Sequence, residues 1–83
     1  MKLNLNDNQK QFLFDEYYVD SKVLDALTYK GWENYFIKNF IWKLTIIPNG
    51  WSELVLINIE TPEIEYNISL NFQGNDLEKL LSI

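Results

Sequence analysis

The sequence predicts an α+β fold in which N-terminal helices pack on a three-stranded antiparallel β-meander, followed by a short C-terminal helix. Three observations support this prediction. Apolar residues recur at helical spacing between residues 8 and 36, an Asn49-Gly50 step separates two apolar segments, and residues 64–72 alternate apolar with polar side chains. Asn-Gly accommodates the two positive φ angles of a type I′ turn, so it is the strongest short-range signal of a β-hairpin.

Length and composition indicate one small domain that spans residues 1–83. The chain has 83 residues, 47% of them hydrophobic, which is enough apolar side chain to build a core and argues against disorder. No segment reaches the roughly 20 apolar residues of a membrane span, and the N-terminus lacks the apolar run of a signal peptide. We therefore expect a cytoplasmic protein that does not contact a membrane.

The first predicted helix begins near Asn8. Asn6 or Asp7 can cap it, and Gln9 lies three residues after Asn6, as in a capping box. The aromatic residues between positions 11 and 19 are also typical of β-strands, so a strand is the alternative for that segment.

Two more helices are expected before the hairpin. Asp20 or Ser21 can cap a second helix, and Gly31 can end it in the left-handed conformation. A short third helix is indicated by Trp32, Tyr35 and Phe36, which have i, i+3, i+4 spacing.

A two-residue loop at Asn49-Gly50 predicts the register of the hairpin formed by residues 40–59. Pro48 then lies opposite Trp51, and alternate side chains share a face. This register places the following residues on the core face: Phe40, Trp42, Leu44, Val55 and Ile57. In the third strand we expect the apolar members of the alternation to join that face, namely Tyr66, Ile68 and Leu70.

The chain closes on a second predicted capping box. Asn75 is the expected N-cap, with Glu78 at the third helical position. The apolar residues that follow at helical spacing, Leu77, Leu80 and Leu81, predict a short helix that packs on the rest of the domain.

The predicted register also defines an apolar patch on the opposite face of the hairpin. Its residues are Ile41, Ile47, Leu54 and Leu56. Either another part of the chain covers this patch, such as the strand-like segment 2–5, or the patch is exposed and meets a partner or a second copy. Trp51 beside the turn would then be an anchor, and the first hairpin strand, if it is an edge, could pair with a partner strand.

The amino acids that are absent exclude several kinds of chemistry. The chain contains no cysteine, no histidine and no arginine. Common zinc sites, Cys-His and Ser-His-Asp catalysis and bidentate arginine contacts to phosphate or guanine are therefore excluded. The sequence predicts a protein without enzymatic activity, cofactor or metal.

Charge argues against direct binding to nucleic acid. The formal net charge is −5, and the seven lysines are scattered along the sequence. Three helices followed by a hairpin would also fit a winged helix, but this charge disfavours DNA contact. A protein partner with a basic surface fits the charge better.

Two acidic stretches are candidate contacts for such a partner. The first contains Asp15, Glu16, Asp20 and Asp25, and the second contains Glu60, Glu63 and Glu65. Charge on exposed helices and turns is ordinary, so these stretches are also explained as solvated faces, while pairs of carboxylates could bind Ca²⁺ or Mg²⁺ or act as a glycosidase pair.

The leading hypothesis is a binding protein that occupies a basic surface of a nucleic-acid-handling enzyme and inhibits it. In size, charge and lack of catalytic residues the chain is similar to small acidic inhibitors such as phage anti-defence proteins and toxin-immunity proteins. In this hypothesis the acidic residues steer association, and the apolar patch with Trp51 forms the buried anchor. The alternative is a homo-oligomer, such as a homodimer, or a small subunit that assembles through the apolar outer face of the 40–59 hairpin.

Overall fold

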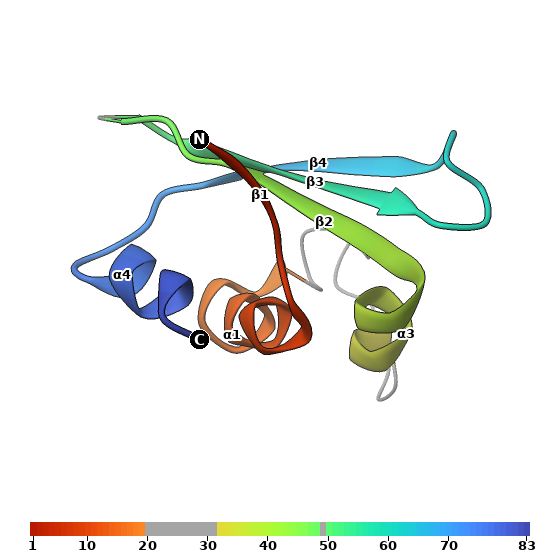
Figure 1. Ribbon diagram of the computed structural model, residues 1–83, viewed down its shortest axis with the longest axis horizontal. Coiled ribbons are helices and arrows are strands. Elements are labelled where there is room, and N and C mark those ends of the chain that lie inside the picture. Colours follow the sequence, from red (N-terminus) through yellow and green to blue (C-terminus); the bar gives the residue numbers. More distant parts are fainter. Residues whose placement is uncertain (20–31, 49) are drawn as a thin grey trace.

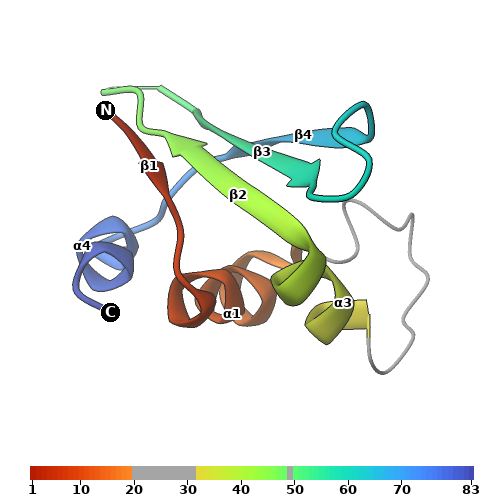
Figure 2. The ribbon, with the colours of Figure 1, turned by 45° about the vertical axis from the view of Figure 1, so that its right-hand side comes forward.

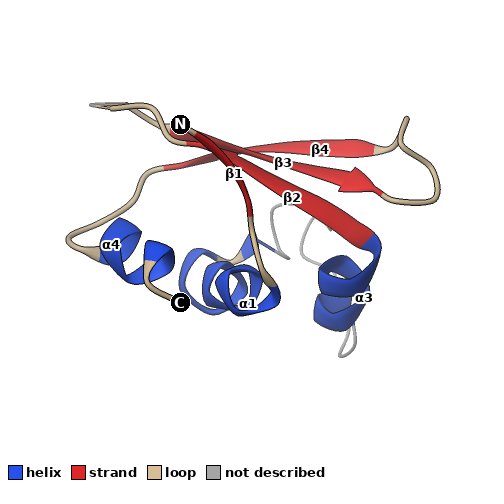
Figure 3. Cartoon of the chain, viewed as in Figure 1, coloured by secondary structure: helices blue, strands red, loops and turns tan. Residues whose placement is uncertain are grey.

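A four-stranded antiparallel sheet forms one layer of the protein, and helices cover one of its faces (Figure 1). The computed structural model describes residues 1–19, 32–48 and 50–83. Its elements in chain order are β1 (Lys2–Asn4), α1 (Asp7–Tyr17), α3 (Trp32–Asn39), β2 (Phe40–Thr45), β3 (Ser52–Asn58), β4 (Glu65–Leu70) and α4 (Asp76–Leu81). Figures 2 and 3 show α1, α3 and α4 on the same side of the sheet, which confirms the α+β class.

The sheet has one strand more than predicted. Its strand order is β1-β2-β3-β4, and Leu3 of β1 pairs with Leu44 of β2. The segment we considered as a cover for the hairpin therefore extends the sheet. Because β1 pairs with β2, the first hairpin strand is internal and cannot pair with a partner strand.

The predicted hairpin register is wrong by one residue. Leu44 pairs with Leu54 and Trp42 pairs with Leu56, whereas the two-residue loop had placed Leu44 opposite Val55. The connection is longer than two residues, because β2 ends at Thr45 and β3 begins at Ser52. Since β3 is apolar on both faces, its hydrophobic pattern did not distinguish the two registers.

This shift moves two predicted patch residues into the core. Leu54 and Leu56 are both 0% exposed, on the face that the helices cover. Val55 and Ile57 lie on the outer face instead, half-buried, next to Lys43 and Ile41 of β2. The third strand faces as predicted, since Ile68 pairs with Leu54 and Tyr66 with Leu56.

The core is centred on Trp42, which is fully buried between the sheet and the helices. Its ring contacts Phe14 of α1 edge to face, with centroids 5.2 Å apart. Its indole N–H donates to the carbonyl of Phe36 at 3.0 Å, so the one polar atom of the ring is satisfied. Among the described residues, the other large side chains that are fully buried are Phe36, Phe40, Leu13, Leu44, Leu54, Leu56, Leu70, Leu80 and Val19.

The N-terminal capping box is confirmed. Asn6 Oδ1 accepts the backbone N–H of Gln9, and Gln9 Oε1 accepts the backbone N–H of Asn6, each at 2.8 Å. Residues 11–17 are therefore helical rather than a strand, despite their aromatic content. Gln9 Nε2 also donates to the carbonyl of Leu80 at 3.0 Å, which ties α1 to α4.

The other helix predictions have mixed outcomes. The predicted third helix is confirmed as α3. At α4, Asn75 is the N-cap but makes no side-chain capping bond, so the second capping box is wrong. Its backbone (φ −101°, ψ 22°) lies outside the extended region that directs an N-cap side chain back to the helix. The predicted second helix, from Asp20 or Ser21 to Gly31, lies outside the described residues.

Candidate functional site

The connection between β3 and β4 carries the densest negative charge of the described chain. Three exposed carboxylates, Glu60, Glu63 and Glu65, lie within six residues of sequence. Between and beside them are two isoleucines with largely exposed side chains, Ile59 at 54% and Ile64 at 45%. We call residues 59–65 the acidic turn, and Figure 1 shows it at the far end of the sheet from the β2–β3 connection.

The side chain of Asn58 holds the acidic turn through hydrogen bonds. It is 8% exposed, and its Oδ1 accepts the backbone N–H groups of Glu60 and Thr61 at 3.0 and 2.9 Å. Its Nδ2 lies 3.4 Å from the hydroxyl of Tyr35, to which it donates. An asparagine that bonds the backbone two and three residues ahead holds a turn in one conformation. The carboxylates are therefore presented on an ordered backbone.

The acidic turn is also joined to the corner between α3 and β2. The backbone N–H of Ile59 donates to the carbonyl of Asn39 at 3.0 Å. Two further backbone bonds close the turn, from Ile64 N to the carbonyl of Thr61 and from Asn58 N to the carbonyl of Ile64, at 2.9 and 3.1 Å.

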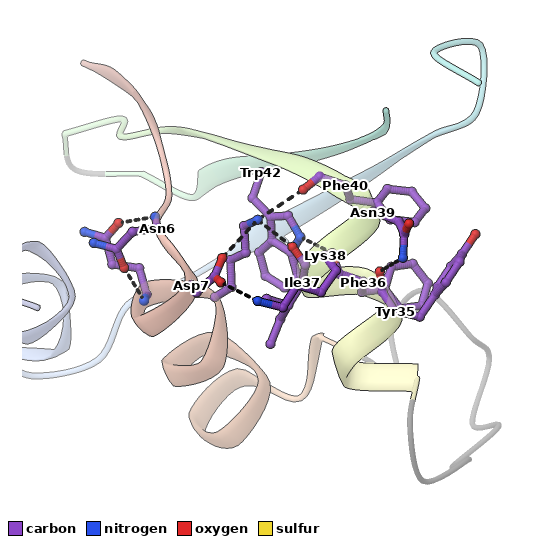
Figure 4. A network of polar contacts seen from close by, with 11 residues as sticks. Asn6, Asp7, Tyr35, Phe36, Ile37, Lys38, Asn39, Phe40 and Trp42 are labelled. Carbon is purple, nitrogen blue, oxygen red and sulfur yellow. Dashed lines mark hydrogen bonds and ion pairs between the residues drawn. The ribbon is translucent and has the colours of Figure 1, made fainter. Parts of the chain in front are cut away.

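The carboxylates of the turn have no charged partner in the described part of the chain. Both ion pairs found there use Asp7, with Lys10 at 3.8 Å and Lys38 at 3.1 Å. Figure 4 shows Lys38 directed toward Asp7 of α1. The negative charge of the turn is therefore available to an external cation.

Lys10 supports the corner to which the turn is attached. It is 7% exposed, and its ammonium donates to the carbonyls of Ile37 and Phe40 at 2.8 and 3.1 Å, at the C-terminal end of α3. A cation there satisfies terminal carbonyls and interacts favourably with the helix dipole. Burial lowers the pKa of Lys10 below its ordinary value, while Asp7 acts in the raising direction.

Replacing Lys10 by alanine should reduce the free energy of unfolding by about 1–3 kcal/mol, because two buried carbonyls lose their donor. The matched control is Lys38→Ala, which removes an exposed partner of the same Asp7 and should cost less than about 1 kcal/mol. Urea unfolding followed by tryptophan fluorescence measures both. Equal losses in the two variants would contradict this role of Lys10.

A second candidate surface is an open groove at the opposite end of β3, lined about equally by polar and apolar surface. It has a volume of about 500 Å³. Two predicted contact residues lie in it, namely Ile47 and Trp51, which is 57% exposed. The remaining lining residues are Ile46, Pro48, Gly50, Ser52, Asn71, Phe72, Gly74 and Leu77.

One wall of this groove is formed by residues 71–77, and Tyr17 holds this segment in place through hydrogen bonds and a ring contact. Its hydroxyl donates to Asp76 Oδ2 at 2.7 Å and accepts the backbone N–H of Gln73 at 2.9 Å. Its ring contacts Phe72 edge to face at 5.3 Å. Gly74, whose φ of 54° suits glycine, then turns the chain into α4.

Replacing Tyr17 by phenylalanine should lower the free energy of unfolding at neutral pH by about 1 kcal/mol. Burial raises the pKa of Tyr17, with Asp76 acting in the same direction and the Gln73 N–H in the opposite one. The unfolded chain therefore loses this proton first, and the contribution of Tyr17 falls as pH rises beyond about 10. The stability difference between wild type and variant should shrink from pH 8 to pH 11 in urea titrations. A constant difference would contradict this.

The predicted site residues do not form one surface. Glu60, Glu63 and Glu65 share the acidic turn, whereas Ile47 and Trp51 lie at the other end of the sheet. Asp15 and Glu16 are exposed on α1, in the helical layer. Ile41, which is 39% exposed, lies on the outer face of the sheet, whereas Leu54 and Leu56 lie in the core. Asp20 and Asp25 lie outside the described residues.

Several residues that shape these surfaces were missed by the sequence analysis. Asn58 lies two residues before the Glu60-Thr61-Pro62 segment, and an asparagine at that position is a signal for an Asx turn. Phe72 and Leu77 carry no local signal for the groove, since the pairing of β4 with β3 brings Phe72 there and the packing of α4 brings Leu77 there. The described residues contain no group of three or more His, Cys, Asp or Glu that could hold a metal ion.

Comparisons with protein-family models, with curated proteins and with solved structures find no match to this chain. Among the residues that the structure describes, no helix has the length and apolar character needed to cross a membrane.

Proposed function

We propose that this chain is a non-enzymatic protein-binding module that occupies a basic surface of its partner with the acidic turn. The observation that carries the proposal is a turn held by Asn58 that presents two exposed isoleucines and three carboxylates, none of which has an ion-pair partner among the described residues. Preorganisation matters because a turn that is already ordered loses little conformational entropy when it binds.

The most concrete form of the proposal is an inhibitor of a nucleic-acid-handling enzyme, of the phage anti-defence or toxin-immunity type. Enzymes that hold nucleic acid present clustered lysine and arginine to the phosphate backbone. The carboxylates of the acidic turn can form ion pairs with the same lysine and arginine side chains. The exposed Ile59 and Ile64 can bury apolar area beside these ion pairs. A chain that binds there blocks access without any chemistry of its own.

Affinity capture tests this proposal. The immobilised wild-type chain should retain a basic protein in stoichiometric amount from the lysate of its host, or of an organism the host infects, at low salt. The protein should be lost as salt rises, and a Glu60→Lys/Glu63→Lys bait should not retain it. Capture by both baits alike, or capture that resists salt, would contradict binding through the acidic turn.

The alternative function is assembly of the chain into an oligomer or a larger complex through an apolar surface. On the outer face of the hairpin this surface is now formed by Ile41, Val55 and Ile57 rather than by leucines. The groove at Trp51 favours the same alternative, since it combines an exposed tryptophan with apolar side chains such as Phe72 and Leu77, and tryptophan is enriched among interface anchors. Binding of this kind should tolerate salt and be lost with Trp51→Ala.

A further inference from the structure

The hydrogen-bond pattern between β3 and β4 determines which backbone groups of β4 point away from the sheet. Asn58 N donates to the carbonyl of Ile64, so the hydrogen-bonded pairs of this ladder recur every second residue from that point. Alternate residues of β4 therefore direct their backbone toward β3, and these are Tyr66, Ile68 and Leu70. The backbone N–H and C=O groups that point away from the sheet belong to Glu65, Asn67 and Ser69.

This edge lacks the features that usually prevent strand pairing. β4 lies last in the strand order, and no described strand pairs with its outer side. Its six residues include no proline, glycine or lysine, and its only charge is Glu65 at one end. The other edge strand, β1, is only three residues long and carries Lys2, both of which limit pairing.

We propose that β4 pairs antiparallel with β4 of a second copy, about a two-fold axis through Asn67. In this register Glu65 lies opposite Ser69 of the second copy, and Asn67 lies opposite its own counterpart. Glu65, Asn67 and Ser69, whose backbone groups point outward, then each lie opposite a residue of the second copy whose backbone groups also point outward. The two residues of each such pair exchange two N–H···O bonds. The two sheets become one continuous sheet with the helices of both copies on the same face.

The side chains favour a second copy as the occupant, because the seam is self-complementary. Glu65 meets a serine hydroxyl, which can donate to the carboxylate, rather than another carboxylate. On the helix-covered face the half-buried Tyr66 lies opposite Ile68, an aromatic and β-branched pair of the kind that stabilises neighbouring strands. An interface in which one patch meets itself is the usual form of a symmetric dimer.

This inference goes beyond the proposed function and does not depend on it. The variants at Asn67 and the single variants at Ser69 leave the acidic turn unchanged, whereas the binding of a basic partner is tested at Glu60 and Glu63. Glu65 belongs to both surfaces, so a variant that changes Glu65 is used to measure dimerisation alone. Loss of one activity therefore leaves the other measurable.

Substitutions that place a negative or a positive charge at position 69 should change the dimer dissociation constant in opposite directions. Ser69→Glu sets a carboxylate opposite Glu65 in both halves of the seam and should raise the dimer dissociation constant about tenfold. Ser69→Lys should lower it several-fold, since the same positions become ion pairs, and Glu65→Lys/Ser69→Glu should restore it. Sedimentation equilibrium over a concentration series measures all four proteins, with circular dichroism as the check on folding.

A backbone variant tests the same seam without charge. Asn67→Pro removes one outward N–H and leaves the bonds to β3 in place, so it should give a folded monomer, whereas Asn67→Thr should still dimerise. Folded wild type that sediments as a monomer at every concentration would overturn the proposal. So would equal dissociation constants for Ser69→Glu and Ser69→Lys, or a folded Asn67→Pro variant that dimerises as wild type does.

Discussion

Leu54→Asp should unfold the protein, while Val55→Asp, one residue along the same strand, should leave it folded. Leu54 is fully buried opposite Leu44 and Ile68, so the variant loses the burial of a leucine and must also bury a carboxyl group. The two costs together come to roughly 5 kcal/mol or more. A small domain has only about 5–15 kcal/mol of stability in total.

Val55 lies on the outer face, half-buried beside Lys43 and Asn67. An aspartate there can reach solvent and the lysine, so the loss should be about 1 kcal/mol. Circular dichroism and urea unfolding distinguish the variants. Tolerance of Leu54→Asp together with unfolding by Val55→Asp would contradict the register and restore the one predicted from a two-residue loop.

Glu60→Lys/Glu63→Lys should weaken binding to a basic partner by at least about tenfold, chiefly through slower association. Both side chains are exposed and neither has an ion-pair partner among the described residues, so fold stability should change little. Surface plasmon resonance with the captured partner measures the association and dissociation rates.

The matched control is Asp15→Lys/Glu16→Lys on α1, which moves the formal net charge from −5 to −1, as the turn variant does. A partner that contacts the acidic turn should bind this control with near wild-type affinity. Equal weakening by both variants would mean that net charge, and not the turn, attracts the partner.

The elements were largely predictable because local rules agree with the final fold. The capping box at Asn6, the helix at Trp32–Asn39 and the alternating strand at Glu65–Leu70 each carry a signal within a few residues. The register of the hairpin was not predictable in this way, because β3 can bury either Leu54 and Leu56 or Val55 and Ile57. Packing against Trp42 and β4 decides it, and packing has no local signature.

The candidate site was predictable only in part for the same reason. The predicted cluster of Glu60, Glu63 and Glu65 is also a cluster in the structure, because the three residues lie within one turn and residues close in sequence are then close in space. Trp51 and the acidic residues were combined in one binding hypothesis, but the fold puts Trp51 at the opposite end of β3 from the acidic turn. The segment Lys2–Asn4 was described as strand-like but was not placed in the sheet, because three residues are too few for an alternation pattern to assign a strand to a sheet.

The most direct test of the account is a competition measurement with the captured partner. A fluorescently labelled nucleic acid bound to that partner is titrated with wild-type chain, and anisotropy reports its release. We predict stoichiometric displacement by wild type and by Asp15→Lys/Glu16→Lys, and little displacement by Glu60→Lys/Glu63→Lys. A ternary complex that retains the nucleic acid, or equal displacement by all three proteins, would contradict the claim that the acidic turn occupies a nucleic-acid-binding surface.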